Sequence, residues 1–282
     1  MNHQPAAGVL YIVATPIGNL EDITLRALRI LENVDLIACE DTRRTRGLLS
    51  HYSISTPTIS YYREKERKRS VTLLEQLRRG RSVALVSDAG TPALSDPGAV
   101  VVRKARRAGI RVVPIPGPSA LTASVAAAGL RETTFCFLGF PPASQRERRQ
   151  LFKSLAPLRR TLVFYESPHR IRATVRELLS ALGDRDCLFC RELTKIHEEI
   201  RESGLAALSA NLEERRVKGE IVLLVAGKKE VDQPETEDLD ELLRWHRHRG
   251  NSLKQAVSDI SRDLGLKRTP VYRRALEIWH KE

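Results

Sequence analysis

The 282-residue sequence lacks any apolar run of about eighteen residues, the length that a helix needs to cross a membrane. Its first residues, Met1 to Gly8, also lack a basic region followed by an apolar stretch and a cleavage site, so we expect no secretory signal. Hydrophobic residues make up 41% and charged residues 29% of the chain, as is usual for a globular protein with a substantial core. These features predict a cytoplasmic location.

Cysteine is scarce, with four residues, Cys39, Cys136, Cys187 and Cys190. The last two have the spacing of a metal or redox pair, but no second Cys or His pair completes a zinc site, and they lie inside an apolar segment. A reduced thiol in such a segment behaves as a small hydrophobic side chain. We therefore predict structural thiols and no metal.

Several common catalytic motifs are absent. No G-x-G-x-x-G pattern follows the first predicted strand, which argues against a dinucleotide site of the Rossmann type. The sequence also has no Walker pattern ending in Gly-Lys-Ser/Thr, which argues against a nucleoside triphosphatase. Without a Gly-x-Ser-x-Gly elbow or a His-Glu-x-x-His motif, the usual hydrolase and metalloprotease classes lose their main support.

Positive charge, in contrast, is in excess. The formal net charge is +12, which indicates an anionic partner. Residues 63–81 hold eight Arg or Lys against three Glu, and residues 244–282 hold ten against four acidic residues. One such cluster is compatible with a solvated helix face, but two in a chain this basic favour nucleic acid.

Short apolar runs alternate with helical patterns along residues 9–128. Strands are predicted at residues 9–14, 34–39, 58–61, 83–86 and 112–115, and helices at 24–31, 42–52, 63–79, 97–108 and 119–128. This alternation predicts an α/β lobe with an open, mostly parallel sheet over residues 1–130. A second, mixed α/β lobe is predicted over residues 131–228, with strands at 135–140, 162–165, 187–191 and 221–225, and a weaker one at 198–202. Helices are expected there at 145–155, 169–182 and 204–215.

Residues 229–240 are charged and show no apolar periodicity, which predicts a linker. Beyond it, residues 241–282 are expected to form a basic appendage. A helix begins at Leu253, Gly265 can end it, and a second helix over Val271–Ile278 carries Arg273 and Arg274. Two short helices around a Gly-containing turn are typical of a helix-turn-helix, although a helical hairpin that only packs on the protein has the same pattern.

Three Gly- and Pro-containing loops directly follow predicted strands. They are Ala14–Asn19, Ser87–Pro92 with its continuation to Gly98, and Pro116–Ala120. Open α/β sheets bind ligands at the carboxyl ends of their strands, and glycine lets the backbone approach a ligand closely. Each loop alone could be a plain turn, but the three together predict one wall of a ligand cleft.

At these loops the sequence resembles the tetrapyrrole-methylase superfamily, the class III S-adenosylmethionine-dependent methyltransferases, which have a two-lobed α/β fold. The resemblance is closest to the branch that modifies small-subunit ribosomal RNA, and its basic C-terminal helices match too. The matching segments are Ala14–Leu20, Cys39–Arg43, Ser87–Pro92, Pro116–Ser119, Phe164–Arg170, Arg191–Lys195 and Gly219–Glu220.

The resemblance implies transfer of a methyl group from S-adenosylmethionine to the ribose 2′-hydroxyl of a cytidine in the decoding region of 16S ribosomal RNA. It also implies a homodimer, and a partner that is either the RNA or the 30S subunit. The cofactor contacts that it implies come from the three loops: Ile17, Asp88, Ala89, Thr91, Pro92, Ser119 and Ala120.

Asp88 and Ser119 could instead cap the helices expected to follow them. A ribose hydroxyl is protonated at neutral pH, so a general base would assist its attack. The candidates are Asp41, Glu166, His169 and Glu220; Asp41 and Glu166 are preferred because both lie at strand ends.

Six basic side chains are candidate RNA contacts: Arg43, Arg44, Arg170, Lys195, Arg273 and Arg274. The first four could instead pair with acidic residues of the protein. Two other functions stay open at this point. One is methylation of a tetrapyrrole carbon, against which the basic charge argues, and the other is an RNA-binding relative that has lost catalysis.

Overall fold

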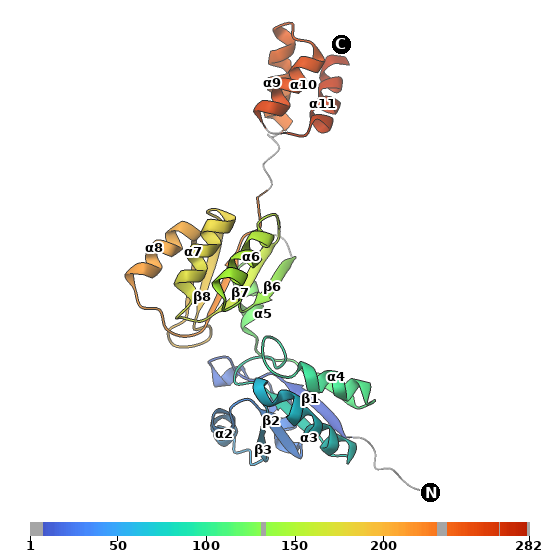
Figure 1. The fold of residues 1–282 in the computed structure, drawn as a ribbon, viewed down its shortest axis with the longest axis vertical. Helices are drawn as coiled ribbons and strands as arrows, with labels where there is room; N and C mark the ends of the chain where they lie inside the picture. Colours follow the sequence, from blue (N-terminus) through green and yellow to red (C-terminus); the bar gives the residue numbers. More distant parts are fainter. Residues whose placement is uncertain (1–7, 131–133, 230–235, 265, 281–282) are drawn as a thin grey trace. The chain divides into compact units, whose positions relative to one another are not determined.

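The structure, a computed structural model, describes residues 8–130, 134–229, 236–264 and 266–280. Contacts between residues divide the chain into two units, Met1–Lys228 and Lys229–Glu282. Both β-sheets belong to the larger unit, and the described residues of the smaller unit form helices (Figure 1). No helix in the described part of the chain has the length and apolar character needed to cross a membrane.

The first sheet is parallel throughout, with the strand order β3-β2-β4-β1-β5. Its central strand β4 is buried at all four residues, as expected for a strand that is covered on both faces. The predicted open parallel sheet is therefore confirmed. The strands are β1 (Val9–Val13), β2 (Leu36–Cys39), β3 (Thr58–Ser60), β4 (Val83–Val86) and β5 (Arg111–Ile115).

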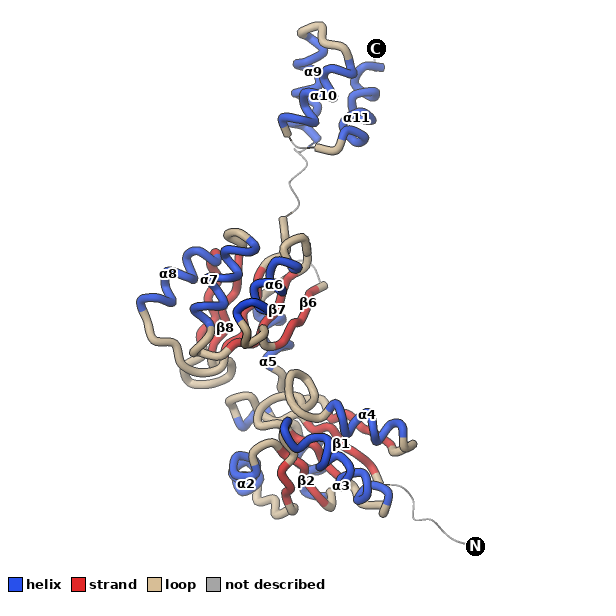
Figure 2. The backbone as a smooth tube through the Cα atoms, in the orientation of Figure 1, coloured by secondary structure: helices blue, strands red, loops and turns tan. Residues whose placement is uncertain are grey.

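Helices pack on both faces of this sheet (Figure 2). On one face lie α1 (Leu25–Asn33) and α2 (Thr42–His51), and on the other α3 (Glu66–Arg78) and α4 (Ala99–Arg107). Ala84 and Leu85, adjacent in β4, belong to the two opposite cores because successive strand residues point to opposite faces. Short 3-10 turns, η1 (Leu20–Asp22) and η2 (Arg63–Lys65), complete this lobe.

The second sheet is mixed, with the order β6-β7-β10-β8-β9. Only β6 and β7 pair in parallel; the other pairs are antiparallel. One face is covered by three helices and the other by α5 (Ala120–Ala127) together with Ile17. The strands are β6 (Phe135–Gly139), β7 (Thr161–Glu166), β8 (Asp186–Arg191), β9 (Glu199–Gly204) and β10 (Ile221–Val225), and the three helices are α6 (Gln145–Leu155), α7 (Ile171–Leu182) and α8 (Leu205–Glu214).

Several helices begin later than the sequence predicts, and two of these shifts have a clear local form. The helix expected from Arg63 starts as the turn η2 and becomes α-helical at Glu66. The helix expected from Pro97 starts at Ala99, because its N-cap Gly98 has φ +145°, a backbone conformation that a helix does not allow. Residues 89–98 are not helical, so Asp88 does not cap the helix that follows it in the sequence, whose N-cap is Gly98.

Cys187 and Cys190 are both buried in β8 and belong to the cores on opposite faces of the second sheet. Residues three apart in a strand point to opposite sides, so these two thiols cannot hold one metal ion together. Burial raises the pKa of Cys190 to about 12, which keeps its thiol protonated.

The smaller unit packs α9 (Thr236–His248), α10 (Leu253–Asp263) and α11 (Arg268–His280) around one apolar core. The sequence predicts a linker over 229–240 followed by two helices, whereas α9 begins at Thr236, inside that stretch. Leu239, Leu242 and Leu243 have helical spacing and could have revealed it. Residues 264–267 join α10 to α11; Gly265, expected to end the first of these helices, lies outside the described residues.

Arg148 and Glu177 form a buried ion pair between α6 and α7. Nε and Nη2 of Arg148 donate to the two Glu177 carboxylate oxygens at 2.8 and 3.0 Å, and Nη1 donates to the carbonyls of Pro142 and Ala143. Burial disfavours the Glu177 carboxylate, but Arg148 and Gln145 donate to it, and its pKa lies below the ordinary value. The pair thus fixes the loop that leads from β6 to α6.

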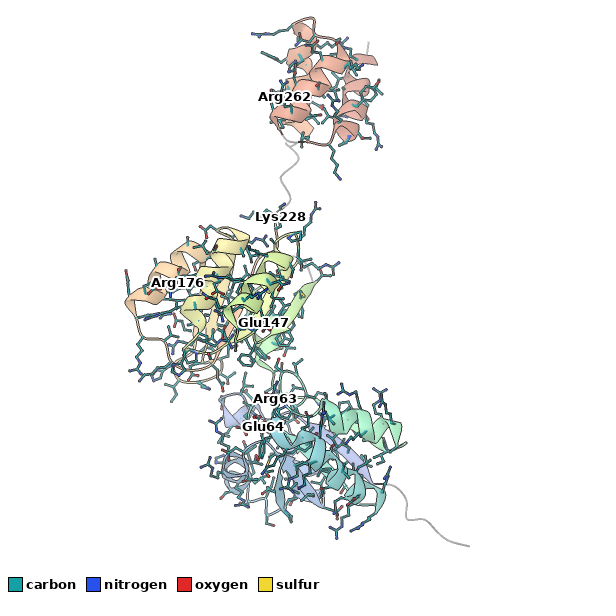
Figure 3. The ribbon with its side chains drawn as sticks, viewed as in Figure 1. Arg63, Glu64, Glu147, Arg176, Lys228 and Arg262 are labelled. Carbon is teal, nitrogen blue, oxygen red and sulfur yellow. The ribbon has the colours of Figure 1, made fainter. Side chains whose placement is uncertain are left out.

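We predict that Glu177→Gln lowers the free energy of unfolding by about 3 kcal/mol at pH 7, because Arg148 stays buried without its counter-ion. The folded-state pKa of Glu177 is lowered, so the stabilisation is complete above the unfolded pKa of about 4.3 and disappears as pH falls through the folded value. Urea unfolding at pH 7 and at pH 3 measures both effects. Glu147→Gln, at an exposed position of α6 that Figure 3 labels, serves as the control and should change stability by less than about 0.5 kcal/mol. An equal loss at both pH values would contradict the assignment.

Candidate functional site

Three loops meet at the carboxyl end of the first sheet. They follow β4, β1 and β5, which are neighbours in the strand order. Thr15 and Gly90 exchange two backbone hydrogen bonds of 2.9 and 3.0 Å, joining the first loop to the second. The Thr91 hydroxyl donates to the carbonyl of Pro118 at 3.4 Å, which ties the second loop to the third. The loops predicted to form one wall of a cleft therefore lie together.

A cavity of about 320 Å³ opens beside these loops in the larger unit. One side is made by the three loops, and the other by residues at the ends of β7 and β10 in the second sheet. Apolar side chains and several carboxylates share its lining, which consists of Ile17, Asp88, Ala89, Gly90, Thr91, Leu94, Asp96, Ser119, Ala120, Phe140, Tyr165, Glu166, Ser167, Pro168, Leu193, Gly219, Glu220, Ile221 and Val222. We refer to it as the first cavity.

Six of the seven predicted cofactor contacts line the first cavity: Ile17, Asp88, Ala89, Thr91, Ser119 and Ala120. Pro92 is buried next to it but does not line it. Ser119 is the N-cap residue of α5, yet its side chain makes no capping hydrogen bond. The hydroxyl of Tyr165 accepts a hydrogen bond from the Leu121 N–H at 3.1 Å and so fixes the start of that helix against the second sheet.

Asp88 links the second loop to the start of α2. Its Oδ1 accepts a hydrogen bond from the backbone N–H of Asp41 at 2.9 Å, and its Oδ2 lies 3.4 Å from Nη1 of Arg44. The carboxylate thus connects the ends of β4 and β2 while facing the cavity.

The two preferred general-base candidates are engaged by the protein itself. Asp41 is the N-cap of α2, where its Oδ1 accepts from the Arg43 N–H at 2.8 Å, and the hydrogen bonds from Arg43 lower its pKa. Glu166 is 2% exposed; it accepts from the Ser167 N–H at 2.8 Å and from the Thr174 hydroxyl at 2.5 Å. Only Glu166 lines the first cavity, and Asp41 lies outside it.

Of the other two base candidates, His169 is exposed in the turn before α7 and does not line the first cavity. Glu220 does line it, and its Oε2 accepts a hydrogen bond from the Lys195 ammonium at 3.2 Å.

The predicted RNA-contact residues differ in how far their charged groups are engaged by other residues of the protein. Nη2 of Arg170 donates to the carbonyls of Pro141 and Pro142 at 2.5 and 3.0 Å, so this guanidinium is used to shape a loop. Lys195 lies between Glu192 and Glu220, at 2.8 and 3.2 Å. Arg43 and Arg44, with side chains 88% and 69% exposed, each make one ion pair with a neighbouring aspartate and still face solvent.

Asp96 also lines the first cavity, although no sequence motif distinguishes it from the rest of the second loop's continuation. Burial raises its pKa to about 6, and the nearby carboxylates of Asp88 and Glu220 add to the effect. Its neighbour Ser95 has φ +68°, and a side chain on Gly139 would lie 2.7 Å from the Ser95 hydroxyl. Strained backbone and a raised pKa are both common at functional sites.

A second cavity, also of about 320 Å³, adjoins the first. The two share Ile17, Asp88, Ala89 and Glu220. The remaining lining comes from the first loop, one side of α2, Ser87 and Lys195, and consists of Thr15, Pro16, Gly18, Leu20, Arg44, Thr45, Gly47, Leu48, Ser87 and Lys195.

Residues 9–209 match the family model of the tetrapyrrole (corrin/porphyrin) methylases. The chain belongs to this family. It is 41% identical over 280 residues to the ribosomal RNA small subunit methyltransferase I of Halalkalibacterium halodurans, covering 98% of this chain and 96% of that one. It is 44% identical to the protein of the same name from Synechocystis, covering 96% and 98%. The expected resemblance and the expected enzyme class, an S-adenosylmethionine-dependent methyltransferase, are confirmed.

Solved structures of this methylase fold superpose on the larger part of the chain. Diphthine synthase matches with a TM-score of 0.61 at 17% identity, covering 79% of this chain and 91% of that one. Cobalt precorrin-4 methyltransferase matches with a TM-score of 0.57 at 19% identity, covering 77% and 94%. At these identities the likeness confirms the two-sheet fold alone.

We predict that Asp96→Asn stabilises the protein, and that the gain grows between about pH 4 and pH 6. The folded-state pKa of Asp96 is raised, so the free energy of unfolding of the wild type falls as pH rises from the unfolded pKa of about 3.9 to the folded value. Above the folded value this contribution no longer changes with pH. Thermal melting of both proteins from pH 4 to pH 8 measures the difference.

Asp35→Asn provides a control of opposite sign. Oδ2 of Asp35 accepts from the N–H and the hydroxyl of Ser82 at 2.7 and 2.8 Å, which lowers its pKa, so this substitution should destabilise at neutral pH. An Asp96→Asn effect that does not vary with pH would show that the Asp96 carboxyl titrates at its ordinary value.

Proposed function

We propose that this methyltransferase modifies the ribose 2′-hydroxyl of a cytidine in the decoding region of small-subunit (16S) ribosomal RNA, with S-adenosylmethionine as methyl donor. The observation that carries the proposal is the identity of 41% and 44%, over almost the whole chain, to proteins named ribosomal RNA small subunit methyltransferase I. The net charge of +12 supports an anionic polymer as partner. The cytoplasm as location, the homodimer and the 30S subunit as partner remain predictions.

The residues of the first cavity fit S-adenosylmethionine. This cofactor carries a sulfonium and an ammonium group, short methylene segments and a flat adenine ring. The cavity is lined by four carboxylates, Asp88, Asp96, Glu166 and Glu220, among the side chains of Phe140, Tyr165, Leu193, Ile221 and Val222. Carboxylates stabilise the cationic centres in a partly buried site, and apolar walls take the ring and chain. When bound, the cofactor supplies a methyl carbon whose bond to sulfur breaks as the bond to the ribose oxygen forms, leaving a neutral thioether.

Positioning is the main task of the protein in such a transfer, because the ribose oxygen must lie in line with the methyl group. Ile17 and Ala89, shared by the two cavities, fix the wall where the two reactants meet. Asp41 and Glu166 act as positioning residues in this scheme: the Asp41 N–H holds Asp88, and Glu166 holds the start of α7. Two carboxylates, Asp88 and Glu220, line both cavities. Asp88 is held by the Asp41 N–H, so in this scheme Glu220 accepts the hydroxyl proton.

The deciding experiment incubates the full chain with S-adenosylmethionine labelled in its methyl group and, separately, small ribosomal subunits, naked 16S RNA or a tetrapyrrole precursor. We expect label in the RNA, at a 2′-O-methylcytidine after nuclease digestion. Label only in the tetrapyrrole would support carbon methylation instead. Cofactor binding without any transfer would indicate an RNA-binding relative without catalysis.

Asp88→Ala should weaken S-adenosylmethionine binding at least tenfold in calorimetry. It removes both a carboxylate of the first cavity and the acceptor that holds the Asp41 N–H. Asp88→Asn keeps an acceptor for that N–H and should lose less affinity, which separates the positional effect from the charge. Wild-type affinity in both variants would place the cofactor elsewhere.

In the smaller unit, the exposed side of α11 near its start is a candidate RNA contact. Thr269, Tyr272 and Arg273 are exposed at helical spacing near the start of α11, while Val271 and Ala275 on the other side are buried. Arg274 is used differently: its guanidinium donates twice to Asp240 of α9 at 2.6 Å. Of the two arginines predicted from the sequence, we therefore propose Arg273 as the RNA contact.

Arg273→Ala should weaken RNA binding and reduce the slope of log K against log salt by about one unit, since one phosphate contact is lost. Filter binding between 50 and 200 mM salt, on the order of physiological ionic strength, measures this. Arg262→Ala is the matched control, because Arg262 (labelled in Figure 3) is exposed in α10 but paired with Asp259 and Asp263. Equal slopes for the two variants would remove α11 from the interface.

A further inference from the structure

The second cavity shares four lining residues with the first, and its other ten lining residues have no role in the proposed cofactor site. Ile17, Asp88, Ala89 and Glu220 border both spaces, so atoms on either side of them lie close to one another. A group that reacts with a ligand in the first cavity can approach it from this side. The second cavity is thus placed to hold a substrate.

The lining of the second cavity differs in kind from that of the first. Beside the shared residues it presents the hydroxyl-bearing side chains Thr15, Thr45 and Ser87 and the cations Arg44 and Lys195. Outside the shared residues, the lining of the first cavity includes the aromatic and branched apolar side chains Phe140, Tyr165, Leu193, Ile221 and Val222. A sugar with attached phosphates suits hydroxyls and cations, because phosphate oxygens bind Arg and Lys and sugar hydroxyls exchange hydrogen bonds with Ser and Thr.

Gly47 of α2 lines the second cavity. It is an interior residue of that helix, where glycine is one of the weakest helix formers, and its φ is not in the left-handed region. A Cβ built on it would meet no atom within 4 Å, so packing does not require glycine here. Gly47 lines the second cavity, so a side chain at this position would occupy space of that cavity.

Gly18 lines the second cavity next to Lys195. A Cβ on Gly18 would lie 2.3 Å from Cγ of Lys195, so the aliphatic part of the lysine lies directly on this backbone. The Asn19 N–H also donates to the Thr194 hydroxyl at 3.1 Å. These contacts hold the Lys195 ammonium at the border of the second cavity, between Glu192 and Glu220.

We infer that the second cavity receives the target nucleotide of the RNA, with its ribose at the wall formed by Ile17 and Ala89 and its phosphates near Arg44 and Lys195. This inference rests on the proposed function. It requires the nucleotide to leave its stack, as nucleotides that enzymes modify within a pocket do. Gly47 is then a specificity-determining residue, since it leaves room that the nucleotide occupies.

Gly47→Met tests the inference by filling the second cavity. We expect an S-adenosylmethionine dissociation constant within twofold of the wild type and a kcat/KM for small-subunit RNA at least tenfold lower, mainly through KM. Gly47→Ala should lose less activity and raise the melting temperature, because alanine is the better helix former. Ser50→Met is the matched control: Ser50 is exposed in the same helix and lines neither cavity.

Arg44→Ala, with Arg46→Ala as control, supplies a second measurement that does not depend on how Gly47→Met folds. Both arginines are exposed in α2, but only Arg44 lines the second cavity. We expect at least a tenfold rise in KM for RNA in Arg44→Ala and less than twofold in Arg46→Ala. The inference would be overturned if each variant and its control had the same KM for RNA. It would also be overturned if a variant lost as much affinity for S-adenosylmethionine as it lost in kcat/KM. A wild type that methylates no RNA would instead refute the proposed function, which keeps the two failures apart.

Discussion

The pair of backbone hydrogen bonds between Thr15 and Gly90 is the constraint on which the site depends. It joins the loops after β1 and β4, which neighbour each other in the first sheet, and the Thr15 hydroxyl adds a bond of 3.2 Å to the Ser87 carbonyl. Gly90 meets the bridge with φ +78°, a conformation that glycine adopts without strain. A Cβ there would lie 3.3 Å from Ile17, so the residue also lets the two loops close on each other.

Ile17 follows from this bridge. Held two residues beyond Thr15, it is 7% exposed and packs with Val163, Val222 and Leu224 on the face of the second sheet that α5 also covers. The same side chain borders both cavities. Ile17 therefore both contributes to the apolar core of the larger unit and forms part of the wall between the two cavities. A substitution at Ile17 would lower stability and also change the shape of both cavities.

The strand-then-loop patterns predicted that Ile17, Asp88 and Ser119 lie together, because parallel strands end at one edge of a sheet, and the three residues line one cavity. Roles that depend on partners far along the chain could not be predicted. Arg170 looked like a phosphate contact, but Pro141 and Pro142 take its guanidinium, and Arg274 is taken by Asp240. Asp96 was missed because its raised pKa arises from burial and from carboxylates that only the fold brings near it.

Positive charge lies on the surface of the protein, whereas carboxylates line the first cavity. The chain is strongly basic, with exposed arginines such as Arg43 and Arg44 on α2, yet the first cavity is lined by Asp88, Asp96, Glu166 and Glu220. A basic surface attracts an anionic polymer from a distance, whereas carboxylates in a partly buried cavity favour a small cation and disfavour phosphate. Asp88 and Glu220 line both cavities, so in the proposed reaction the two substrates are distinguished by Arg44 and Lys195, which line only the second cavity. The phosphates bind on the side of α2 and Lys195, and the uncharged ribose lies at the wall shared with the cationic methyl donor.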